Sequence, residues 1–302
     1  MNDGCAPPCD PRQIEIVQGS HIGQVRKVNQ DDCGEFVHPT LPLRLAVTAD
    51  GMGGHQGGDV ASRLVIEAVG ETFDQAREAS AELVHATLEQ ANQRILELAG
   101  QRSDLKGMGS TGVAVLFGDG GHGWIANVGD SRAYRLRHGR FEQLTRDHSV
   151  VAELVEAGAI TEEDARLHPR RNELMRALGV GRDVEIELHE LSVLPGDRYL
   201  LCSDGLWGLV SDAEMGQVLS ELPPQEAVRV LIDRANEEGG NDNITAQIAT
   251  VPEPASATLA SGEAAGTMGG ALEGAGPTRA RLTLTLVALT TVVGLLIWWL
   301  LR

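Results

Sequence analysis

Apolar residues recur at spacings of three and four in two stretches of the N-terminal half, residues 60–73 and 84–98. This period predicts amphipathic helices that bury one face and expose the other. Asp59 and Ser80 stand close to the two starts, and we expect them to cap these helices. A third helix is expected to begin near Pro224 and to end at Gly239-Gly240.

Short runs rich in Val, Ile and Leu, bounded by Gly or Asp, predict β-strands in the remaining sequence. These runs are residues 44–48, 111–117, 123–128, 132–137, 184–189, 199–203 and 244–250. Few of the connections have the regular strand–helix–strand alternation of a parallel sheet. We therefore expect antiparallel sheets that are covered by helices.

The C-terminal segment departs from this pattern, because residues 282–301 form a run of 20 residues without a charge. A helix of this length covers ~30 Å, which is one hydrocarbon thickness. A buried C-terminal helix is the alternative, but it would carry a polar stripe, and only scattered threonines interrupt this run. We predict a single transmembrane helix. Arg279 and Arg281 precede it and only Arg302 follows, so the N-terminal side is expected in the cytoplasm.

These patterns divide the chain into four parts. Residues 1–13 are expected to be a tail, 14–251 a catalytic domain, 252–281 a flexible linker and 282–301 the membrane span. The linker is rich in Ala, Gly, Ser, Thr and Pro and has no apolar period. The N-terminus shows no export signal. We therefore expect a single-pass protein of the cytoplasmic membrane whose domain faces the cytoplasm.

Composition narrows the possible functions. A hydrophobic fraction of 42% can fill a core, so the chain is expected to fold. The formal net charge of −18 would repel a phosphate backbone, which argues against nucleic-acid binding. The four cysteines include no close metal-finger pair, and this usage favours a reducing compartment.

Acidic residues beside glycine follow several of the predicted strands. Asp50-Gly51 and Asp204-Gly205 come directly after apolar runs, and residues 29–32 and 240–243 are similar acidic groups. Each motif alone is an ordinary turn sequence. Four of them at strand edges, without a cysteine or histidine ligand set, favour a centre that gathers carboxylates around a hard divalent cation. Magnesium or manganese suits such oxygen ligands.

The same motifs, taken in order, resemble the metal-dependent Ser/Thr protein phosphatases of type 2C, in their bacterial form. The resemblance covers about residues 14–251, and the ordered combination is far more specific than any single motif. The motifs are Arg26 with Asn29-Gln30-Asp31, Asp50-Gly51-Met52-Gly53-Gly54, Gly109-Ser110-Thr111, Asn127-Val128-Gly129-Asp130-Ser131-Arg132, Thr145-Arg146-Asp147-His148, Arg176-Ala177-Leu178-Gly179, Ser203-Asp204-Gly205-Leu206 and Gly240-Asn241-Asp242-Asn243.

This resemblance implies an α+β fold, a four-layer α-β-β-α sandwich of two antiparallel sheets flanked by helix pairs. It also implies a dinuclear Mn²⁺ or Mg²⁺ centre at one end. Asp50 would bridge the two ions, and the Gly51 carbonyl would complete the shell of one. Asp204 and Asp242 would hold the other ion. Asp130 matches the residue that helps to bind a third, weaker ion in bacterial members.

Two further residues match catalytic positions of the family. Arg26 would bind the substrate phosphate, since a planar guanidinium suits two phosphoryl oxygens. Asp31 would orient metal-bound water and is expected to be one of the residues of the metal site. Some members have a proton-donating His after the first Asp-Gly, but this chain has Met52 there, and we do not give that role to His55. His21 stands where bacterial relatives usually have Asp.

The segment of residues 149–176, called the flap segment below, matches a mobile flap of the family. Arg170 and Arg171 are candidates to meet a phosphorylated substrate, although a charge run is more often a solvated face. His148 is interpreted as part of a helix start. Ser203 is not expected to be a nucleophile, because no His-Asp pair accompanies it.

The leading hypothesis is a membrane-tethered, monomeric phosphatase that removes phosphate from Ser and Thr side chains of proteins and opposes a Ser/Thr protein kinase. A catalytically silent domain that binds phosphoproteins at the membrane is the alternative. The presence of every aspartate of the expected metal centre disfavours it. A third hypothesis keeps the enzyme but directs it to a regulator of sigma-factor partner switching, and the sequence leaves that choice of substrate open.

Overall fold

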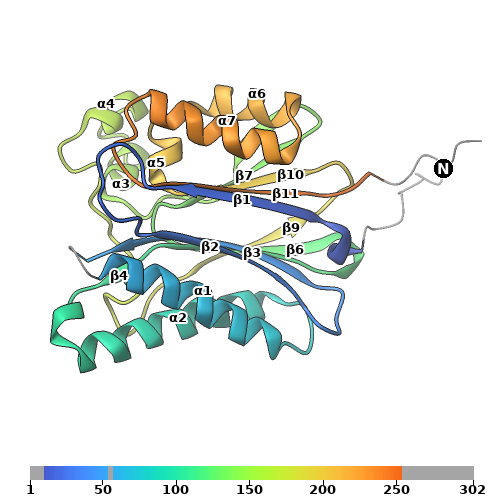
Figure 1. Ribbon diagram of the computed structural model, residues 1–302, viewed down its shortest axis with the longest axis horizontal. Coiled ribbons are helices and arrows are strands. Elements are labelled where there is room, and N and C mark those ends of the chain that lie inside the picture. Colours follow the sequence, from blue (N-terminus) through green and yellow to red (C-terminus); the bar gives the residue numbers. More distant parts are fainter. Residues whose placement is uncertain (1–9, 54–56, 254–302) are drawn as a thin grey trace, which may run out of the picture. The chain divides into compact units, whose positions relative to one another are not determined.

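Two antiparallel sheets lie face to face, and a pair of helices covers the outer face of each (Figure 1). This computed structural model describes residues 10–53 and 57–253. Neighbouring strands in both sheets pair antiparallel. The predicted α+β fold with two antiparallel sheets is therefore confirmed.

The first sheet is covered by helices α6 (Asp212–Glu221) and α7 (Pro224–Glu237). Its strands are, in spatial order, β1 (Glu15–His21), β11 (Ile244–Thr250), β10 (Arg198–Cys202), β7 (Arg132–Arg137) and β8 (Arg140–Gln143). A short helix, α5 (Asp204–Trp207), directly follows β10.

The second sheet is covered by helices α1 (Gly58–Asp74) and α2 (Ala81–Gln101). Its strands are, in spatial order, β2 (Asp31–Val37), β3 (Arg44–Met52), β5 (Gly112–Phe117), β6 (His122–Val128) and β9 (Glu187–Ser192), and β4 (Gly109–Ser110) pairs with the end of β3. The other elements are α3 (Val150–Glu156), α4 (Glu162–Leu167) and three 3₁₀ turns, η1 (Pro11–Gln13), η2 (Ser103–Leu105) and η3 (Asp119–Gly121).

Alternation along the strands divides the apolar residues among three cores. In β3, Leu45 and Val47 belong to the core under α1 and α2, whereas Ala46 belongs to the core between the sheets. In β10, Leu200 packs under α6 and α7, whereas Leu201 faces the other sheet. Successive side chains of a strand point to opposite faces, so each buried strand contributes to two cores and appears in the sequence as a continuous apolar run.

Several predicted elements agree closely with the structure, and others differ. Residues 132–137 and 244–250 form strands with the predicted bounds, and the Ser80 hydroxyl caps α2 by accepting from the Leu83 N–H. The Asp59 cap is wrong: α1 begins at Gly58, its N-cap is Gly57, and Asp59 lies in the first turn. An acidic side chain there still interacts favourably with the helix dipole.

No helix in the described ranges, 10–53 and 57–253, is both long and apolar enough to span a bilayer. The predicted transmembrane helix at residues 282–301, residues 254–281 of the predicted linker and the first nine residues of the predicted tail lie outside the described residues.

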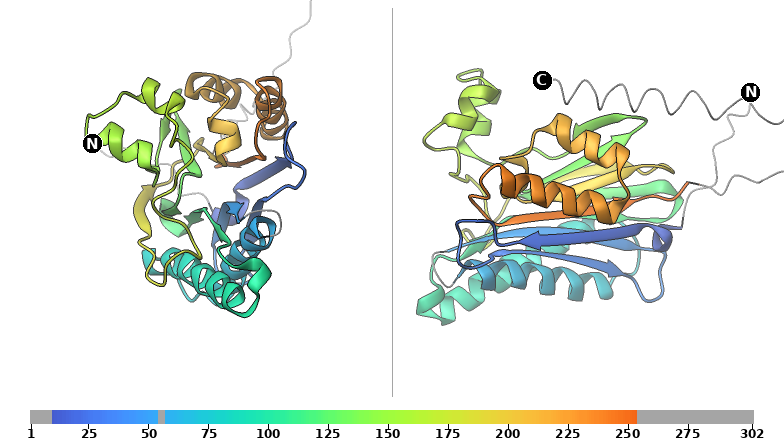
Figure 2. Two further views of the ribbon diagram at one scale, coloured as in Figure 1. Left: turned by 90° about the vertical axis from the view of Figure 1, so that its left-hand side faces the viewer. Right: turned by 45° about the horizontal axis from the view of Figure 1, so that its top comes forward.

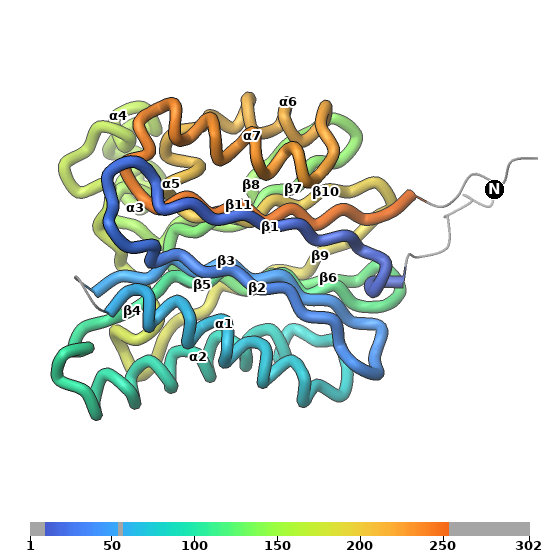
Figure 3. The backbone as a smooth tube through the Cα atoms, viewed as in Figure 1, coloured from blue at the N-terminus to red at the C-terminus, as the bar shows by residue number. Residues whose placement is uncertain are grey.

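One end of the sandwich collects the termini of strands from both sheets (Figure 3). There β2 begins opposite the end of β3, with Asp31 paired in register to Asp50. At the same end β1 stops opposite the start of β11, with His21 paired to Ile244. Helices α3, α4 and α5 lie at this end as well, as the end-on view in Figure 2 shows. The acidic motifs that follow the strands are therefore gathered in one region.

Candidate metal centre

The hairpin of β2 and β3 places two carboxylates side by side. Asp31 opens β2 and lies directly opposite Asp50 near the end of β3. The backbone of Asp50 is fixed by its neighbours, because its N–H donates to Thr111 Oγ1 (2.9 Å) and its carbonyl accepts from Ser110 Oγ (3.0 Å). The Gly-Ser-Thr motif thus holds the Asp50 backbone in place, and the pairing register sets the position of Asp31.

Gly51 allows three backbone segments to meet beside Asp50. Its N–H donates to the Gln30 carbonyl at 3.0 Å. A Cβ on Gly51 would lie 1.9 Å from the Gly58 carbonyl oxygen, and a Cβ on Gly58 would lie 2.5 Å from the Gly51 carbonyl oxygen. Any side chain at either position would push the start of α1 away from the end of β3.

Asp204 and Asp242 reach the same end from the other sheet. Asp204 is the first residue of α5, and a Cβ on Gly205 would lie 2.0 Å from the Asn243 carbonyl oxygen, so α5 packs against the loop that carries Asp242. Asp242 Oδ1 accepts from the Asn243 N–H at 2.8 Å. Asp242 Oδ2 accepts from Arg26 Nη2 at 2.5 Å, which holds the guanidinium at the edge of the acidic group.

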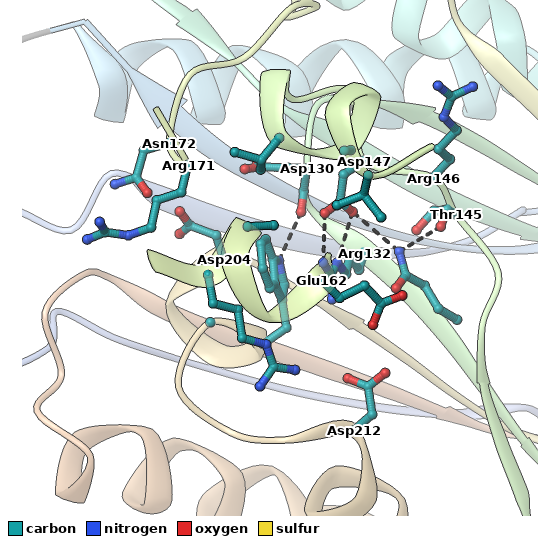
Figure 4. Close-up of a pocket in the computed structure, with 18 of the residues that line it drawn as sticks. Asp130, Arg132, Thr145, Arg146, Asp147, Glu162, Arg171, Asn172, Asp204 and Asp212 are labelled. Carbon is teal, nitrogen blue, oxygen red and sulfur yellow. Dashed lines mark hydrogen bonds and ion pairs between the residues drawn. The ribbon is translucent and has the colours of Figure 1, made fainter. Parts of the chain in front are cut away.

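Asp130 follows β6 and is held through its backbone. Trp207 of α5 donates its indole N–H to the Asp130 carbonyl at 2.9 Å. The Arg132 guanidinium lies 3.5 Å from the centre of the Trp207 ring and donates to both Asp147 carboxylate oxygens, at 2.9 and 2.7 Å (Figure 4). Stacking and a bidentate ion pair therefore fix the aromatic ring that anchors the Asp130 turn.

Burial and mutual repulsion dominate the electrostatics of these acids. Burial raises the pKa of Asp50 well above its ordinary value, and the carboxylates of Asp31, Asp204, Asp130 and Asp242 raise it further. Burial also raises the pKa of Asp204 well above its ordinary value. Burial, only partly opposed by hydrogen bonds, raises the pKa of Asp31 to about 6. Each group thus lies in the field of the others, and the structure brings together all five predicted aspartates.

The donor set suits hard divalent cations. Asp31 Oδ1 and Asp204 Oδ1 are buried and have no hydrogen-bond partner among the described residues, and such oxygens ordinarily have one. Within 10–53 and 57–253, no group of three or more His, Cys, Asp or Glu side chains is placed so that these side chains alone could hold a metal ion. Magnesium commonly keeps several waters and binds one or two carboxylates, so these acids fit open sites for such ions.

A cavity of about 610 Å³ adjoins the acidic group, with Asp130, Asp204 and Asp242 in its wall. The flap segment forms another part of the wall and contributes Arg171 (Figure 4). Arg170 instead pairs with Glu173, with Nε 2.6 Å from Oε2, at an exposed position. Of the two candidate arginines of the flap, only Arg171 therefore lines the space beside the aspartates.

Four other residues named from the sequence have distinct places. His21 Nδ1 accepts from the Gly23 N–H (3.0 Å), so it supports the turn after β1. Met52 ends β3 and offers no proton, and His55 lies outside the described residues. Ser203 is buried beside the site and donates to Asp31 Oδ2 at 2.6 Å.

Sequence reasoning missed the contacts that support this group. It gave Ser203 no role, and it did not mention Thr245, which also contacts Asp31. Ser203 stands directly before Asp204-Gly205, and that position could have drawn attention to it. Thr245 follows the Gly240-Asn241-Asp242-Asn243 motif by two residues, and this position could likewise have drawn attention to it.

This chain is similar in sequence and in fold to known proteins. The protein phosphatase 2C family model matches residues 18–249. The serine/threonine phosphatase Stp of Listeria innocua is 40% identical over 229 residues, which cover 74% of this chain and 90% of that protein.

Two solved structures extend this similarity to the fold. The Mycobacterium tuberculosis serine/threonine phosphatase PstP/Ppp aligns with a TM-score of 0.73 at 38% identity, over 80% of this chain and 99% of that one. The PstP catalytic domain in complex with two manganese ions aligns with a TM-score of 0.72 at 37% identity, over the same shares of the two chains. This chain belongs to the protein phosphatase 2C family of protein serine/threonine phosphatases, the enzyme class that its motifs predict.

Proposed function

We propose that this chain hydrolyses phosphoserine and phosphothreonine in proteins by direct attack of water at a centre that holds two Mn²⁺ or Mg²⁺ ions. The convergence of five aspartates from both sheets carries the proposal, because two of their buried oxygens have no hydrogen-bond partner in the described part of the chain. We further propose that Asp50 and the Gly51 carbonyl serve one ion, and that Asp50, Asp204 and Asp242 serve the other. The relative that contains two manganese ions supports this choice of metal.

The other residues of the site have roles in binding the substrate and orienting the water. When bound, the two ions supply an activated water nucleophile at neutral pH and neutralise charge on the phosphoryl group. Arg26 lies at the edge of the acidic group, paired with Asp242, and offers further N–H donors to phosphoryl oxygens. Asp31 accepts a hydrogen bond from the attacking water through its buried Oδ1. Met52 has no proton for the leaving alkoxide, so water is proposed to supply it.

Metal dependence is the direct test. The purified full-length chain is expected to hydrolyse an aryl phosphate and a phosphothreonine peptide with Mn²⁺ or Mg²⁺, and to lose turnover in EDTA. Asp50→Asn should abolish turnover, whereas Asp32→Asn, one residue along β2 from Asp31, should leave it intact. Turnover that persists in EDTA contradicts the metal mechanism. Metal-independent binding of phosphopeptides without turnover would favour the catalytically silent alternative.

The setting of the enzyme is a separate proposal. The uncharged run at residues 282–301 supports a single membrane helix, and the arginines before it support a cytoplasmic domain. We propose that the tethered, monomeric enzyme opposes a Ser/Thr protein kinase at that membrane. The full-length chain should sediment with membranes, and a chain that ends at residue 280 should be soluble with equal turnover. Equal solubility of the two chains contradicts the anchor.

Two finer points follow from the same site. Asp130 is proposed to help hold a third, weaker ion, because its carboxylate lies in the field of Asp204 and its backbone is fixed by Trp207. Asp130→Asn should then raise the Mn²⁺ concentration needed for half-maximal turnover.

A comparison of phosphoproteins in cells with wild-type and Asp50→Asn enzyme would identify the substrates. It would also separate kinase substrates in general from a single partner-switching regulator.

A further inference from the structure

Two buried hydroxyl groups hold one oxygen of the Asp31 carboxylate. Ser203 Oγ donates to Asp31 Oδ2 at 2.6 Å, and Thr245 Oγ1 donates to the same oxygen at 2.8 Å. Both residues, called the hydroxyl pair below, are completely buried, and Asp31 is nearly so. Hydrogen bonds to an ionised acceptor are the strong ones, so this oxygen is tightly held.

The hydroxyl pair belongs to the opposite sheet. Asp31 opens β2, whereas Thr245 lies in β11 and Ser203 follows β10. The two hydrogen bonds join residues that are 172 and 214 positions apart in the chain. The contact therefore forms only when the two sheets meet at the metal-centre end, and it ties one sheet to an acidic residue of the other.

The Ser203 side chain bonds to Asp31 and does not cap its own helix. Ser203 occupies the N-cap position of α5, where a serine hydroxyl ordinarily accepts from the first turn, but its side chain makes no such bond. Its oxygen instead accepts from the Thr245 N–H at 3.0 Å while its hydrogen goes to Asp31. The Ser203 hydroxyl therefore accepts from the β11 backbone and donates to Asp31 at the same time.

The hydrogen bonds that lead to Asp31 through Thr245 all run in one direction. Asn29 Nδ2, which can only donate, donates to Ser20 Oγ at 2.8 Å. Ser20 Oγ lies 2.8 Å from Thr245 Oγ1. Because an ionised carboxylate can only accept, Thr245 must donate to Asp31, and Ser20 must then donate to Thr245. Every hydrogen in the chain from Asn29 points toward Asp31.

The result is an asymmetric carboxylate. Oδ2 accepts from both members of the hydroxyl pair, whereas Oδ1 is buried without a hydrogen-bond partner in the described residues. Asp50, directly across the strand pair, is among the groups that interact with the Asp31 side chain. The hydroxyl pair therefore sets which oxygen of Asp31 remains available on the Asp50 side.

We infer that Ser203 and Thr245 are positioning residues that fix the rotamer of Asp31, so that Oδ1 alone serves the divalent-ion centre. The inference rests on the ion site of the proposed function and adds two residues to which the sequence analysis gave no role there. Neighbours that orient a metal-binding group commonly affect metal affinity or activity by about 10–100-fold. The hydroxyl pair is expected to act at this level.

Manganese binding tests the inference without relying on turnover. The full-length chain is stripped of metal with EDTA, and its Mn²⁺ affinity is measured by calorimetry. Thr245→Val and Ser203→Ala should each weaken binding about tenfold and lower kcat for an aryl phosphate by a similar factor. KM for the phosphate should stay within about twofold, because Arg26 is untouched. Thr245→Ser, which keeps the hydroxyl, should restore affinity and kcat.

The matched control is Thr87→Val, which removes an equally buried hydroxyl that donates only to the Val84 carbonyl of its own helix. It should leave Mn²⁺ affinity and kcat within about twofold of wild type. If the hydroxyl pair acts through Asp31, Thr245→Val should have no further effect in an Asp31→Asn chain. This double-mutant cycle separates positioning from a general loss of stability, which would add in both backgrounds.

Three outcomes in the variants overturn the inference. They are unchanged Mn²⁺ affinity and kcat in both hydroxyl variants, failure of Thr245→Ser to restore them, and full additivity with Asp31→Asn. A wild-type chain that binds no Mn²⁺ overturns it as well. A chain that binds Mn²⁺ with the expected pattern but hydrolyses no phosphoester would uphold the positioning role and contradict only the proposed function.

Discussion

Two buried acidic sites of this protein are built in opposite ways. Asp197, 1% exposed, receives both arms of Arg137, at 2.7 and 2.6 Å, together with the Tyr199 hydroxyl and the Leu194 N–H. Asp204 lies among other carboxylates at the metal-centre end and has a buried oxygen without a partner in the described residues. Asp197 is paired with an arginine, whereas Asp204 forms no ion pair with an Arg or Lys in the described part of the chain.

This difference indicates what each site is for. Burying a carboxylate is costly unless it is paired and hydrogen-bonded, and the guanidinium of Arg137 meets that need at Asp197. At the metal-centre end Arg26 pairs with Asp242 at the edge, while Asp31, Asp50 and Asp204 form no ion pair with an Arg or Lys of the described residues. The protein keeps a local excess of negative charge there, which divalent cations can balance.

The largest expected effect is on turnover. Asp204→Asn should lower kcat by roughly 10³-fold, since loss of a metal ligand removes several kcal/mol of charge stabilisation from the transition state. The same change removes a repelled charge, so unfolding of the metal-free chain in urea should occur at an equal or higher midpoint. A clear drop in that midpoint would show that Asp204 is a structural acid like Asp197.

The reverse pattern is expected at the paired site. Arg137→Ala leaves Asp197 buried without its cation and should lower the free energy of unfolding by about 3 kcal/mol. Turnover per folded molecule should be unchanged. Arg140→Ala is the matched control, because that arginine is 81% exposed and pairs only with Glu142; it should cost less than ~1 kcal/mol. Equal costs for the two variants would contradict the distinction.

Added Mn²⁺ should stabilise the folded chain through the metal centre and not through the Asp197 site. At a Mn²⁺ concentration 100 times its Kd, binding to the native state should add about 2.7 kcal/mol and raise Tm by several degrees. Differential scanning calorimetry would measure this shift. The shift should be much smaller in Asp50→Asn and intact in Arg137→Ala. A full shift in Asp50→Asn would place the bound ion elsewhere.

The smallest effect concerns pH. Burial raises the pKa of Asp31 to about 6 in the folded, metal-free chain. The folded state therefore binds this proton more tightly than the unfolded state, and its contribution to stability is present below the unfolded pKa and is lost as pH rises through about 6. In EDTA, raising the pH from about 5 to 7.5 should destabilise wild type by about 1 kcal/mol more than Asp31→Asn. No difference between the two would contradict the assignment.

The sequence predicts the acidic group well and its supports poorly. Asp50 and Asp204 stand beside glycine at the ends of apolar runs. Because strand ends gather at the edges of sheets, the sequence was enough to predict that these two residues lie close together. The hydroxyl pair could not be predicted in this way, because contacts between Asp31 and residues 203 and 245 depend on how two sheets stack. The pattern of apolar and polar residues along the chain does not specify how two sheets stack on each other.

The fold shows the same limit. Strands that are buried on both faces, such as β11, were predicted with their bounds. Strands β1 and β2 were missed, since exposed and half-buried positions leave few apolar residues in them. The capping error at α1 has a local cause. At the N-cap, a Cβ on Gly57 would lie 2.9 Å from the Gly53 carbonyl oxygen and 2.9 Å from the Met108 Cβ, so a capping aspartate would be crowded there.

The hairpin of β2 and β3 places its turn far from the chemistry. Arg44 begins β3, and the six residues from there to Asp50 span about 20 Å of extended chain. Thr40, in that turn, is exposed. An anchoring group attached at Thr40 could hold the enzyme on a sensor chip while the opposite end still faces the bulk solution. Association of phosphoproteins could then be followed in real time without a label near the catalytic residues.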